Sequence, residues 1–358
     1  MSPAADGPVV PPVPPGAAGA SAPDISIIIV TWNGRRHLDA CLQAVAGQTG
    51  VRLETILVDN GSTDGSADHV RSTYPWVRLL ALRDNLGFAG GNNAGVAIAT
   101  GRCVALLNND TVADPGCMRG LLDGLDEAHG IALTTARIVY MHDPSTIDSA
   151  GDGMHRAGGA FKHLHGQPVE RALESREVFG VCGAACLMPR RVFEELGGFD
   201  ESFFFSHEDV DLSYRARLRG YRCRYVAGAV VLHHGSGTSG RTSTWVVFHA
   251  QRNAEWLYLK NTPGSLLLRT LPAHVLYMTA AAVYFARIGR LGAFGRGKWA
   301  ALKGLPAVLR ARAAVQASRR ASTAAIVAQM DTGWMLAKLR EKRFAAGLVE
   351  ENQGPQRP

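Results

Sequence analysis

The hydrophobic residues in the first half of the chain fall into short runs that end in polar residues. The run at 25–30 is apolar except for Ser26 and rich in β-branched residues, which is typical of a strand covered on both faces. Similar runs occur at 53–59, 77–82 and 103–107. Polar turn residues and a segment with helical spacing follow each run, so the alternation predicts an α/β fold with a mostly parallel sheet flanked by helices.

Polar side chains follow the ends of these predicted strands. Parallel strands joined by right-handed crossovers end at one edge of the sheet, so side chains from all of them meet there. Ligands bind at this edge in open α/β sheets. The residues placed there are Thr31, Asn33, Asp59, Asn85 and Asp110.

The fourth predicted strand ends in Asn108, Asn109 and Asp110. A carboxylate with two neighbouring amides suits a hard divalent cation, because Mg²⁺ and Mn²⁺ take oxygen ligands and share their coordination shell with phosphate. The alternative is an ordinary Asx turn that closes a strand, since Asn and Asp are common in turns.

The pattern is less regular after residue 130. A strand is predicted at 131–139, whereas the His- and Gly-rich segment 151–177 gives no assignable pattern. A short helix near 192–196, a helix from His207 and a strand at 221–233 follow. The acidic start and arginine-rich end of the helix from His207 suit the helix macrodipole.

The C-terminal region differs from the rest of the chain in charge. The net charge is +7, but the segment 256–330 contains eleven Lys and Arg residues and no Asp or Glu, which leaves the remainder at −4. The uncharged stretch between Arg269 and Arg287 contains Pro272 and His274 and is shorter than the roughly 20 residues that span a bilayer. The surrounding Ala- and Leu-rich helices with arginines are typical of a region that lies on a membrane surface.

A basic solvated helical bundle or a nucleic-acid patch is the alternative for this C-terminal region. No recognisable nucleic-acid-binding motif is present, and few aromatic residues lie between the charges. Nucleic acid is therefore not an expected partner.

The composition fits a globular protein, with 46% hydrophobic and 19% charged residues. We expect a disordered Pro- and Ala-rich tail at 1–23, an α/β domain at 24–240, a helical membrane-associating region at 241–345 and a flexible tail at 346–358.

The six cysteines are scattered and follow no secretory signal pattern, so we expect free thiols in a reducing cytosol. Cys182 and Cys186 with His233 and His234 could suggest zinc. However, the cysteine pair lies in a run of small apolar residues, and the second pair of such a site is missing.

Five motifs in order along the chain carry a resemblance: TWNG, VDNGSTDGS, NLGFAGGNN, LLNNDT and FSHEDVDLSYR. Together they resemble the family 2 inverting glycosyltransferases, especially the rhamnosyltransferase-like branch that builds bacterial cell-surface polysaccharide. The resemblance covers about 24–240, with Arg252-Asn253 as a weaker match beyond it. It implies a GT-A fold, a nucleotide-diphosphate-sugar donor, and Mg²⁺ or Mn²⁺ as cofactor.

The resemblance also implies roles for residues at the predicted sheet edge. Thr31, Asn33 and Asp59 would line the nucleoside pocket, with Asp59 as acceptor for a ring N–H or a sugar hydroxyl. Arg83 and Asn85 lie where the family's third loop approaches the nucleotide sugar. Ser62 and Asp64 are alternatively loop and cap residues.

The family's metal motif is Asp-any-Asp, and here it is Asn108-Asn109-Asp110. Asp110 is therefore the expected metal ligand, whereas Asn108 and Asn109 are assigned to nucleotide-sugar binding. His233 aligns with the family's histidine after the last strand and would supply another ligand, with His234 as the less favoured neighbour.

By the same resemblance Asp209 is the base that takes the proton of the acceptor hydroxyl, and Glu208 positions it or raises its pKa. Simple partnership with the helix dipole is the alternative for Glu208 and Asp211. For Arg215 and Arg217, surface positions are favoured over diphosphate contacts.

The leading hypothesis is a metal-dependent inverting glycosyltransferase that moves L-rhamnose from dTDP-rhamnose to a lipid-linked or polysaccharide acceptor. It would act peripherally at the cytoplasmic face of the cell membrane, with homo-oligomerisation left open. The alternatives are a mannosyl-, galactosyl- or galactofuranosyltransferase of the same family, and a non-catalytic sugar-nucleotide- or glycan-binding membrane scaffold.

Overall fold

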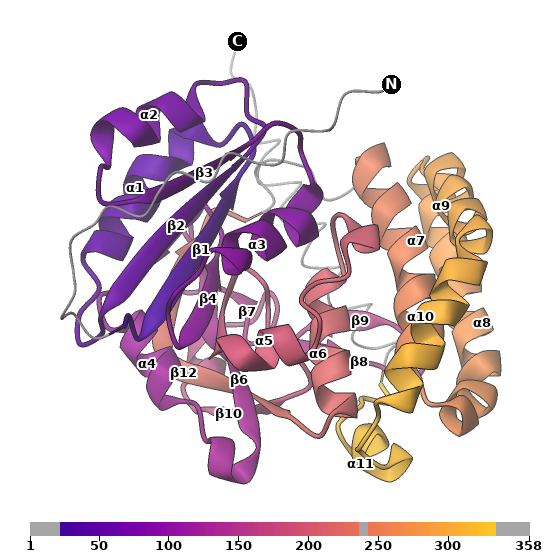
Figure 1. Ribbon diagram of the computed structural model, residues 1–358. Helices are drawn as coiled ribbons and strands as arrows, with labels where there is room; N and C mark the ends of the chain where they lie inside the picture. The colour runs from indigo at the N-terminus through magenta and orange to yellow at the C-terminus, as the bar shows by residue number, and fades with distance from the viewer. Residues whose placement is uncertain (1–21, 236–242, 334–358) are drawn as a thin grey trace, which may run out of the picture.

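The computed structural model describes residues 22–235 and 243–333. A ten-stranded sheet with helices on both faces forms one side of the molecule, and a layer of C-terminal helices forms the other (Figure 1). The sheet has the strand order β10-β12-β6-β11-β4-β1-β2-β3, with β5 paired to β12 and β7 paired to β6. The predicted tails at 1–23 and 346–358 lie outside the described residues, apart from residues 22 and 23.

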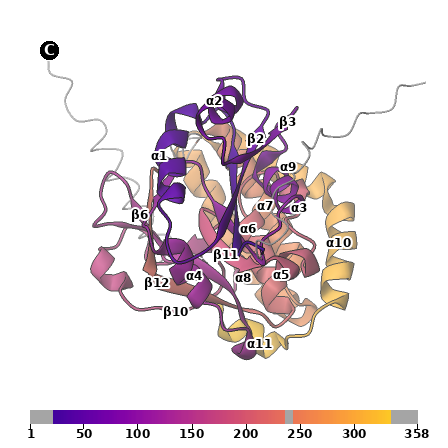
Figure 2. The same ribbon diagram turned by 60° about the vertical axis from the view of Figure 1, so that its left-hand side comes forward.

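The first part of the sheet is parallel, as predicted. Strand β1 pairs in parallel with β2 on one side and with β4 on the other, and β2 pairs with β3. The elements of this part are β1 (Ile25–Thr31), α1 (Arg35–Ala46), β2 (Leu53–Asn60), α2 (Ser66–Thr73), β3 (Arg78–Leu82), α3 (Gly87–Ala97) and β4 (Cys103–Leu107). Figure 2 shows α1 and α3 on opposite faces of these strands.

The second part makes the sheet mixed rather than purely parallel. Strand β11 runs antiparallel between β4 and β6, whereas β6 and β12 pair in parallel. The elements are β5 (Thr111–Ala113), α4 (Cys117–Asp123), η1 (Glu127–His129), β6 (Ile131–Tyr140), β11 (Ala185–Pro189), α5 (Arg190–Glu195), η3 (Glu201–Phe203), α6 (Glu208–Leu218) and β12 (Arg222–His233).

Several very short elements lie in and next to the segment 151–177, which gave no assignable pattern. They are β7 (Ile147–Ser149), β8 (Asp152–Met154), β9 (Ala160–Lys162), η2 (Val169–Ala172) and β10 (Arg176–Val178). Strands β8 and β9 form a hairpin that is separate from the main sheet. Strands of three residues are too short to display an alternating pattern, which explains why none was predictable.

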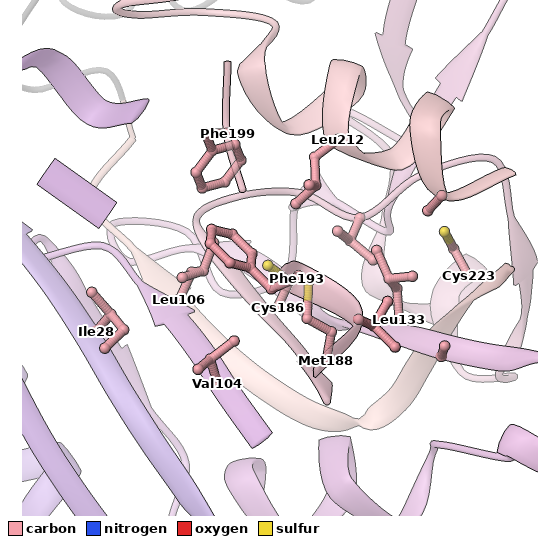
Figure 3. Packing of buried hydrophobic residues seen from close by; sticks show 14 of the residues in the cluster. Ile28, Val104, Leu106, Leu133, Cys186, Met188, Phe193, Phe199, Leu212 and Cys223 are labelled. Atoms are coloured by element: carbon pink, nitrogen blue, oxygen red, sulfur yellow. The ribbon is translucent and has the colours of Figure 1, made fainter. Parts of the chain in front are cut away.

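The main core lies between the sheet and helices α3, α5 and α6. Figure 3 shows Val104 and Leu106 of β4 near Phe193 of α5, with Leu212 of α6 and Phe199, which follows α5, beyond. All of these side chains are buried in one cluster. A second cluster on the opposite face of the sheet packs against α1 and α4, so the central strands are covered on both sides, as their continuous apolar runs predict.

Arg215 and Arg217 are buried in α6, so the expectation of surface positions is wrong. The Arg215 guanidinium donates to Asp211 Oδ2 (2.8 Å) and to the main-chain oxygen of Gly198 (2.8 Å). The Arg217 guanidinium donates to the main-chain oxygen of Phe179 (2.8 Å). Both arginines satisfy loop carbonyls that would otherwise be buried without a donor.

The C-terminal helices pack on α6 through α7 and α10. They are α7 (Thr244–Asn261), α8 (Gly264–Arg287), α9 (Leu291–Lys303), α10 (Leu305–Ala317) and α11 (Thr323–Ala328). Trp256 of α7 donates through Nε1 to the main-chain oxygen of Ala301 in α9 (3.1 Å). The rings of Tyr258 and His274 stack with centroids 3.8 Å apart, which joins α7 to α8.

Helix α8 includes the whole uncharged stretch and extends beyond it, because it begins at Gly264 and contains Arg269 and Arg287. With 24 residues it is long and apolar enough to cross a membrane by length and composition, and it is the one such helix among the residues that the structure describes. Only 17% of its most apolar window is buried inside the protein.

All six cysteines lie in the described part of the chain, where they are buried and form no disulfide bond. Burial raises the pKa of the Cys41 and Cys117 thiols to about 12. Such thiols stay protonated and behave as small apolar side chains.

Candidate active site

The ends of β1 and β2 place two buried polar residues side by side. Thr31 and Asp59 are register partners in these strands, and their exposed fractions are 1% and 3%. Asp59 Oδ1 has no hydrogen-bond partner within 22–235 and 243–333. Burial raises the pKa of Asp59. A buried acceptor of this kind at a sheet edge can receive a ligand N–H or hydroxyl.

Asn33 connects the loops that follow β1 and β2. Its φ is +52°, its Oδ1 accepts from the main-chain N–H of Thr63 (2.8 Å), and its own N–H donates to Ser62 Oγ (2.9 Å). The Asn33 side chain therefore shapes the rim of the pocket. Ser62 is a loop residue, one of the two roles kept open for it.

Asp64 has a structural role at the start of two helices. Its Oδ2 accepts from the first N–H of α1 at Arg35 (2.9 Å), and its Oδ1 accepts from the first N–H of α2 at Ser66 (3.1 Å). These N–H groups have no partner inside their helices, so Asp64 acts as a shared cap.

Arg83 and Asn85 lie in the loop before α3 but differ in their surroundings. The Arg83 side chain is exposed. Asn85 Oδ1 accepts from Asn60 Nδ2 (3.0 Å) and from the N–H of Gly87 (2.8 Å), which closes the turn into the helix. Gly87 has φ +73°, and a Cβ there would collide with the main-chain oxygen of Phe204. The loop is therefore tightly fixed against the segment before α6.

In the Asn108-Asn109-Asp110 turn, only Asp110 has a carboxylate to offer a ligand. Asn109 Nδ2 donates to Thr31 Oγ1 (2.8 Å), and a Cβ at Gly34 would collide with this amide. The main-chain oxygen of Asn108 accepts from Thr111 Oγ1 (2.6 Å). Asn109 therefore joins the turn to the end of β1, and Asn108 is half-buried beside it.

Asp110 and His233 converge because β5 pairs with the end of β12. His233 is the register partner of Thr111, and its Nε2 lies 3.3 Å from Asp110 Oδ1. Both side chains are about nine-tenths buried. The predicted metal ligands, separated by more than a hundred residues in sequence, therefore lie side by side.

The opposite nitrogen of the His233 ring is held by a residue that the sequence did not indicate. His233 Nδ1 lies 2.8 Å from Asp148 Oδ2. Asp148 also accepts from Lys162 Nζ (3.0 Å). Burial would raise the pKa of Asp148, but Lys162, His165 and His233 outweigh burial and hold it well below its usual value.

The charges around His233 also act on the ring itself. Burial would lower the pKa of His233, but hydrogen bonds to Asp110 and Asp148 raise it to about 9. A divalent cation at Nε2 would replace this proton, since a metal-bound imidazole is neutral.

The donor set around Asp110 fits a divalent cation. It combines a carboxylate oxygen with an imidazole nitrogen whose ring is oriented by a second carboxylate, which is the usual environment of a metal-binding histidine. Two protein ligands leave room for diphosphate and water. A pocket of about 610 Å³, lined by Asp110, His37 and His234 among others, opens beside the carboxylate.

Asp209 lies in the first turn of α6, as predicted. Its Oδ2 accepts from the N–H of Gly183 (3.0 Å) and its Oδ1 accepts from the N–H of Val210 (2.8 Å). Burial raises the pKa of Asp209, while these N–H groups and Lys162 oppose the increase. The Asp209 carboxylate is half-buried, so its surface can still be reached by a ligand.

Glu208 and Asp211 have different surroundings from Asp209. Glu208 is 6% exposed, and its Oε2 has no partner among the residues placed by the structure. Burial and the neighbouring Asp209 raise the pKa of Glu208 well above its usual value. Asp211 pairs with Lys260 (2.8 Å) and Arg215 (2.8 Å), so it is a structural residue of the α6–α7 contact.

Asp152 of β8 is a second acid beside Asp209 that sequence reasoning missed. One atom each from Asp152, Cys182 and Asp209 lie within 4.8 Å of one another. Asp152 is 4% exposed, and burial and Asp209 raise its pKa well above its usual value. Of the two carboxyl groups, Asp209 accepts two main-chain N–H groups, which favour its ionised form.

Cys182 thus lies beside two carboxyl groups. Cys186, His233 and His234 do not belong to this group. The zinc site considered from the sequence does not form among the described residues, because its four side chains are not brought together.

Comparison with known proteins shows what the chain is similar to. The family model "Glycosyl transferase family 2" matches residues 26–197. An N-acetylglucosaminyl-diphospho-decaprenol L-rhamnosyltransferase of Mycobacterium tuberculosis is 30% identical over 282 residues, which cover 69% of this chain and 91% of the relative. A PGL/p-HBAD biosynthesis glycosyltransferase of Mycobacterium bovis is 33% identical over 188 residues, or 50% of this chain and 64% of the relative.

Among solved structures, the crystal structure of GalNAc-T7 with UDP, GalNAc and Mn²⁺ has a similar fold. Its TM-score is 0.52, with 16% sequence identity over 67% of this chain and 48% of that chain. At this identity the similarity shows the fold alone.

Proposed function

Since this chain belongs to glycosyl transferase family 2 and is a glycosyltransferase, we propose that it transfers L-rhamnose from dTDP-rhamnose to a lipid-linked or polysaccharide acceptor, with inversion at the anomeric carbon. The product would serve cell-envelope glycan synthesis. The rhamnosyltransferase relative, aligned over 91% of its own length, supports this donor. The observation that carries the proposal is the Asp110–His233 pair at the same sheet edge as Asp59. Asp209 is the fourth acidic or basic group on which the proposal rests, at the start of α6.

The nucleoside of the donor would bind at the ends of β1 and β2. Asp59 Oδ1 is buried and lacks a partner in the described chain, so it would accept from the thymine N–H or from the sugar hydroxyl. Thr31 and Asn109, which are hydrogen-bonded to each other, would line the path from the nucleoside to the diphosphate.

Asp110 and His233 would hold Mg²⁺ or Mn²⁺ against the donor diphosphate. When bound, the cation supplies the positive charge that stabilises the leaving diphosphate. Asp148 would keep the His233 ring in one orientation, with Nε2 facing Asp110.

Asp209 would accept the proton of the acceptor hydroxyl. At the same time the hydroxyl oxygen of the acceptor would attack the anomeric carbon, and the bond from that carbon to the diphosphate would break. The N–H groups of Gly183 and Val210 fix both carboxylate oxygens and favour the ionised form. Burial and Asp209 raise the pKa of the neighbouring Asp152, which disfavours a second negative charge beside Asp209. A metal site and a base in one chain would favour an enzyme over a silent binding subunit.

The C-terminal helices would hold the enzyme on the membrane surface. The outer face of α8 exposes large apolar side chains, namely Leu268, Leu271, Val275, Leu276 and Val283. Arg269 lies between Leu268 and Leu271, and Arg287 ends the helix; each basic residue near anionic lipid contributes about 1 kcal/mol.

The contacts of α8 favour an orientation along the membrane rather than across it. Near the middle of the helix, His274 Nε2 lies 3.0 Å from Glu255 Oε2, and Lys298 Nζ donates to Glu255 Oε1 (2.6 Å). In a spanning helix these charges would lie near the bilayer centre, where each costs at least about 3 kcal/mol. An interfacial position exposes only the apolar outer face to lipid.

Some basic residues of this region are unavailable to lipid. Lys260 is 3% exposed and pairs with Asp200 and Asp211. Lys298 pairs with Glu255, and Arg312 donates to the main-chain oxygen of Thr262 (2.7 Å). The lipid-binding charges would therefore be the exposed arginines, such as Arg269 and Arg287.

The proposal is tested by incubating the full-length protein and Mn²⁺ or Mg²⁺ with dTDP-rhamnose and an N-acetylglucosaminyl-diphospho-polyprenol, followed by mass spectrometry of the lipid. A gain of one deoxyhexose, abolished by chelation, is expected. Parallel reactions contain GDP-mannose, UDP-galactose or UDP-galactofuranose. Transfer from one of these sugars and not from dTDP-rhamnose would overturn the donor assignment.

A further inference from the structure

Four aromatic rings gather where the loop before α6 meets the start of α7. Phe204 and Phe205 belong to the loop, and Trp245 and His249 lie in the first turns of the helix. The ring centroids of Trp245 and His249 are 4.5 Å apart, those of Phe205 and Trp245 are 4.8 Å apart, and those of Phe204 and His249 are 5.6 Å apart. We call these four residues the aromatic platform.

The aromatic platform is not fully covered by protein. Trp245 is 44% exposed, and Phe204, Phe205 and His249 are half-buried. Burial and Arg252 lower the pKa of His249 to about 4, so this ring is neutral at physiological pH. The platform therefore offers uncharged aromatic surface to solvent, with Trp245 as its most exposed ring.

The loop that carries the two phenylalanines has an unusual backbone. Phe204, Ser206 and His207 all have positive φ values, between +62° and +73°. Residues with a side chain rarely adopt positive φ values. Each such backbone conformation costs of the order of 1–3 kcal/mol and persists only where the surroundings enforce it. Strain of this kind is common at ligand-binding sites.

Two residues of α7 enforce this loop conformation. Asn253 Nδ2 lies 2.9 Å, 2.8 Å and 2.7 Å from the main-chain oxygens of Phe203, Phe205 and Ser206. Arg252 Nη2 donates to the main-chain oxygens of Ser202 and Phe203, both at 2.9 Å. Helix α7 therefore fixes the position of the loop that carries Phe204 and Phe205.

The aromatic platform is connected to Asp209 by short contacts. The main-chain oxygen of Phe204 accepts from the N–H of Phe88 (2.8 Å). The Phe88 ring and Asp209 Oδ2 each lie 3.3 Å from the position that a Cβ on Gly183 would occupy. Phe205 is four residues before Asp209 in sequence, and Asp209 lies in the first turn of α6, which follows the loop. The platform is thus connected to the surroundings of the proposed base through Phe88 and Gly183.

An exposed aromatic face suits the carbon-bound hydrogens of a sugar ring. The ring face carries negative charge density, and the C–H groups of a pyranose carry a small positive charge. The donor would occupy the ends of β1, β2 and β4, whereas the platform belongs to the loop before α6 and the start of α7. The acceptor hydroxyl would have to contact Asp209, which lies four residues after the last platform phenylalanine.

We propose that the aromatic platform is the acceptor subsite, with the pyranose ring of the acceptor sugar stacked on Trp245 and its hydroxyl directed to Asp209. This inference rests on the proposed transferase function. It assigns the ligand as a sugar ring and not as the lipid chain of the acceptor.

The first experiment compares Trp245→Ala and Trp245→Phe with Trp76→Ala, a control tryptophan that is 47% exposed outside the proposed site. Acceptor KM is expected to rise about tenfold in Trp245→Ala, since aromatic stacking contributes up to about 1.5 kcal/mol, and to rise less in Trp245→Phe. Donor KM should change by less than about twofold. An unchanged acceptor KM in Trp245→Ala, or an equal rise in Trp76→Ala, overturns the proposal.

The second experiment does not depend on turnover. Saturation-transfer NMR is carried out with methyl β-N-acetylglucosaminide in the presence of dTDP, with Mg²⁺ in place of Mn²⁺. A signal is expected with the wild-type protein and with Trp76→Ala but not with Trp245→Ala. No signal with the wild type overturns the subsite even if the enzyme is active. If Trp245→Ala has a raised KM for the prenyl-linked acceptor but gives a normal NMR signal with the soluble glycoside, Trp245 contacts the lipid. This result would also overturn the proposed sugar subsite.

Discussion

His233 Nδ1 lies 2.8 Å from Asp148 Oδ2, and both side chains are almost completely buried. This contact fixes the imidazole so that its other nitrogen faces Asp110. Asp148 is therefore a positioning residue for the proposed metal site, supplied by a strand of only three residues, β7.

Replacing Asp148 with Asn should weaken metal binding without abolishing the reaction. Loss of a carboxylate that orients a metal-binding histidine typically costs about 10–100-fold in affinity. The measurement is the Mn²⁺ concentration that gives half-maximal activity, compared with that of Asp110→Ala, for which no activation is expected. Equal metal requirements in Asp148→Asn and wild type, with circular dichroism showing both folded, would argue against this role.

Asp209→Asn should reduce kcat by about 10²–10⁴-fold, because the amide cannot accept the acceptor proton. The affinity for dTDP should be nearly unchanged, since the nucleoside would bind at Thr31 and Asp59. Asp68→Asn, at a carboxylate that is 87% exposed on α2, is the matched control. Steady-state kinetics and calorimetric dTDP titration separate the two effects, and a wild-type rate in Asp209→Asn would remove this residue as the base.

Asn253→Ala should impair both stability and catalysis. The side chain is fully buried and contacts three main-chain oxygens of the loop before α6. Leaving these carbonyls without a donor should lower the free energy of unfolding by about 2–3 kcal/mol. We expect a lower kcat with unchanged dTDP affinity, measured at a temperature where the variant remains folded. Urea unfolding gives the first quantity, and a kcat equal to wild type would show that the loop needs no such support.

Membrane binding should depend on the outer face of α8. Replacing Leu268, Val275 and Leu276 with Ser removes three exposed apolar side chains, which would each contribute about 1–3 kcal/mol to insertion. Flotation with vesicles containing anionic lipid should show most of the wild-type protein bound and little of the triple variant. Leu173→Ser, at a leucine that is 60% exposed outside the helical layer, should bind as the wild type does. Full binding of the triple variant would contradict the interfacial orientation.

The stability of the helical layer should depend on pH through Glu255. Burial would raise the pKa of Glu255, but His274 and Lys298 lower it to about 2. Because the pKa of Glu255 is lower in the folded state than the value of about 4.5 in the unfolded state, its ionised carboxylate stabilises the fold at pH values above 4.5. This stabilisation is lost as the pH falls toward 2. The difference in unfolding free energy between wild type and Glu255→Gln should be about 3 kcal/mol at pH 6 and decrease below pH 4.5. A difference that stays constant from pH 6 to pH 3.5 would contradict the linkage.

The parallel half of the fold was predictable because its signal is local. Continuous apolar runs such as 25–30 require two covered faces, and the polar residues after them mark the strand ends. The direction of β11 was not predictable, since an apolar strand has the same pattern whether it is parallel or antiparallel to its neighbours. The burial of Arg215 was likewise hidden, because its partners include main-chain oxygens, which leave no trace in the sequence.

The proposed site was partly accessible for the same reason. Asp59, Asp110 and Asp209 follow recognisable strand ends or begin a helix, so the motifs around them could be identified. Asp148 and Asp152 lie in three-residue strands without a pattern. Only tertiary folding brings Asp148 to His233, which is 85 residues away in sequence, and Asp152 to Asp209.

Helix α7 touches both halves of the molecule. Through Asn253 it holds the loop that leads to Asp209. Through Trp256 it packs on α9, another helix of the C-terminal layer. A fragment that ends with β12 would therefore not be a self-sufficient catalytic unit. Nor could the helical layer be exchanged for an unrelated membrane anchor, because the anchor and the catalytic loop share one helix.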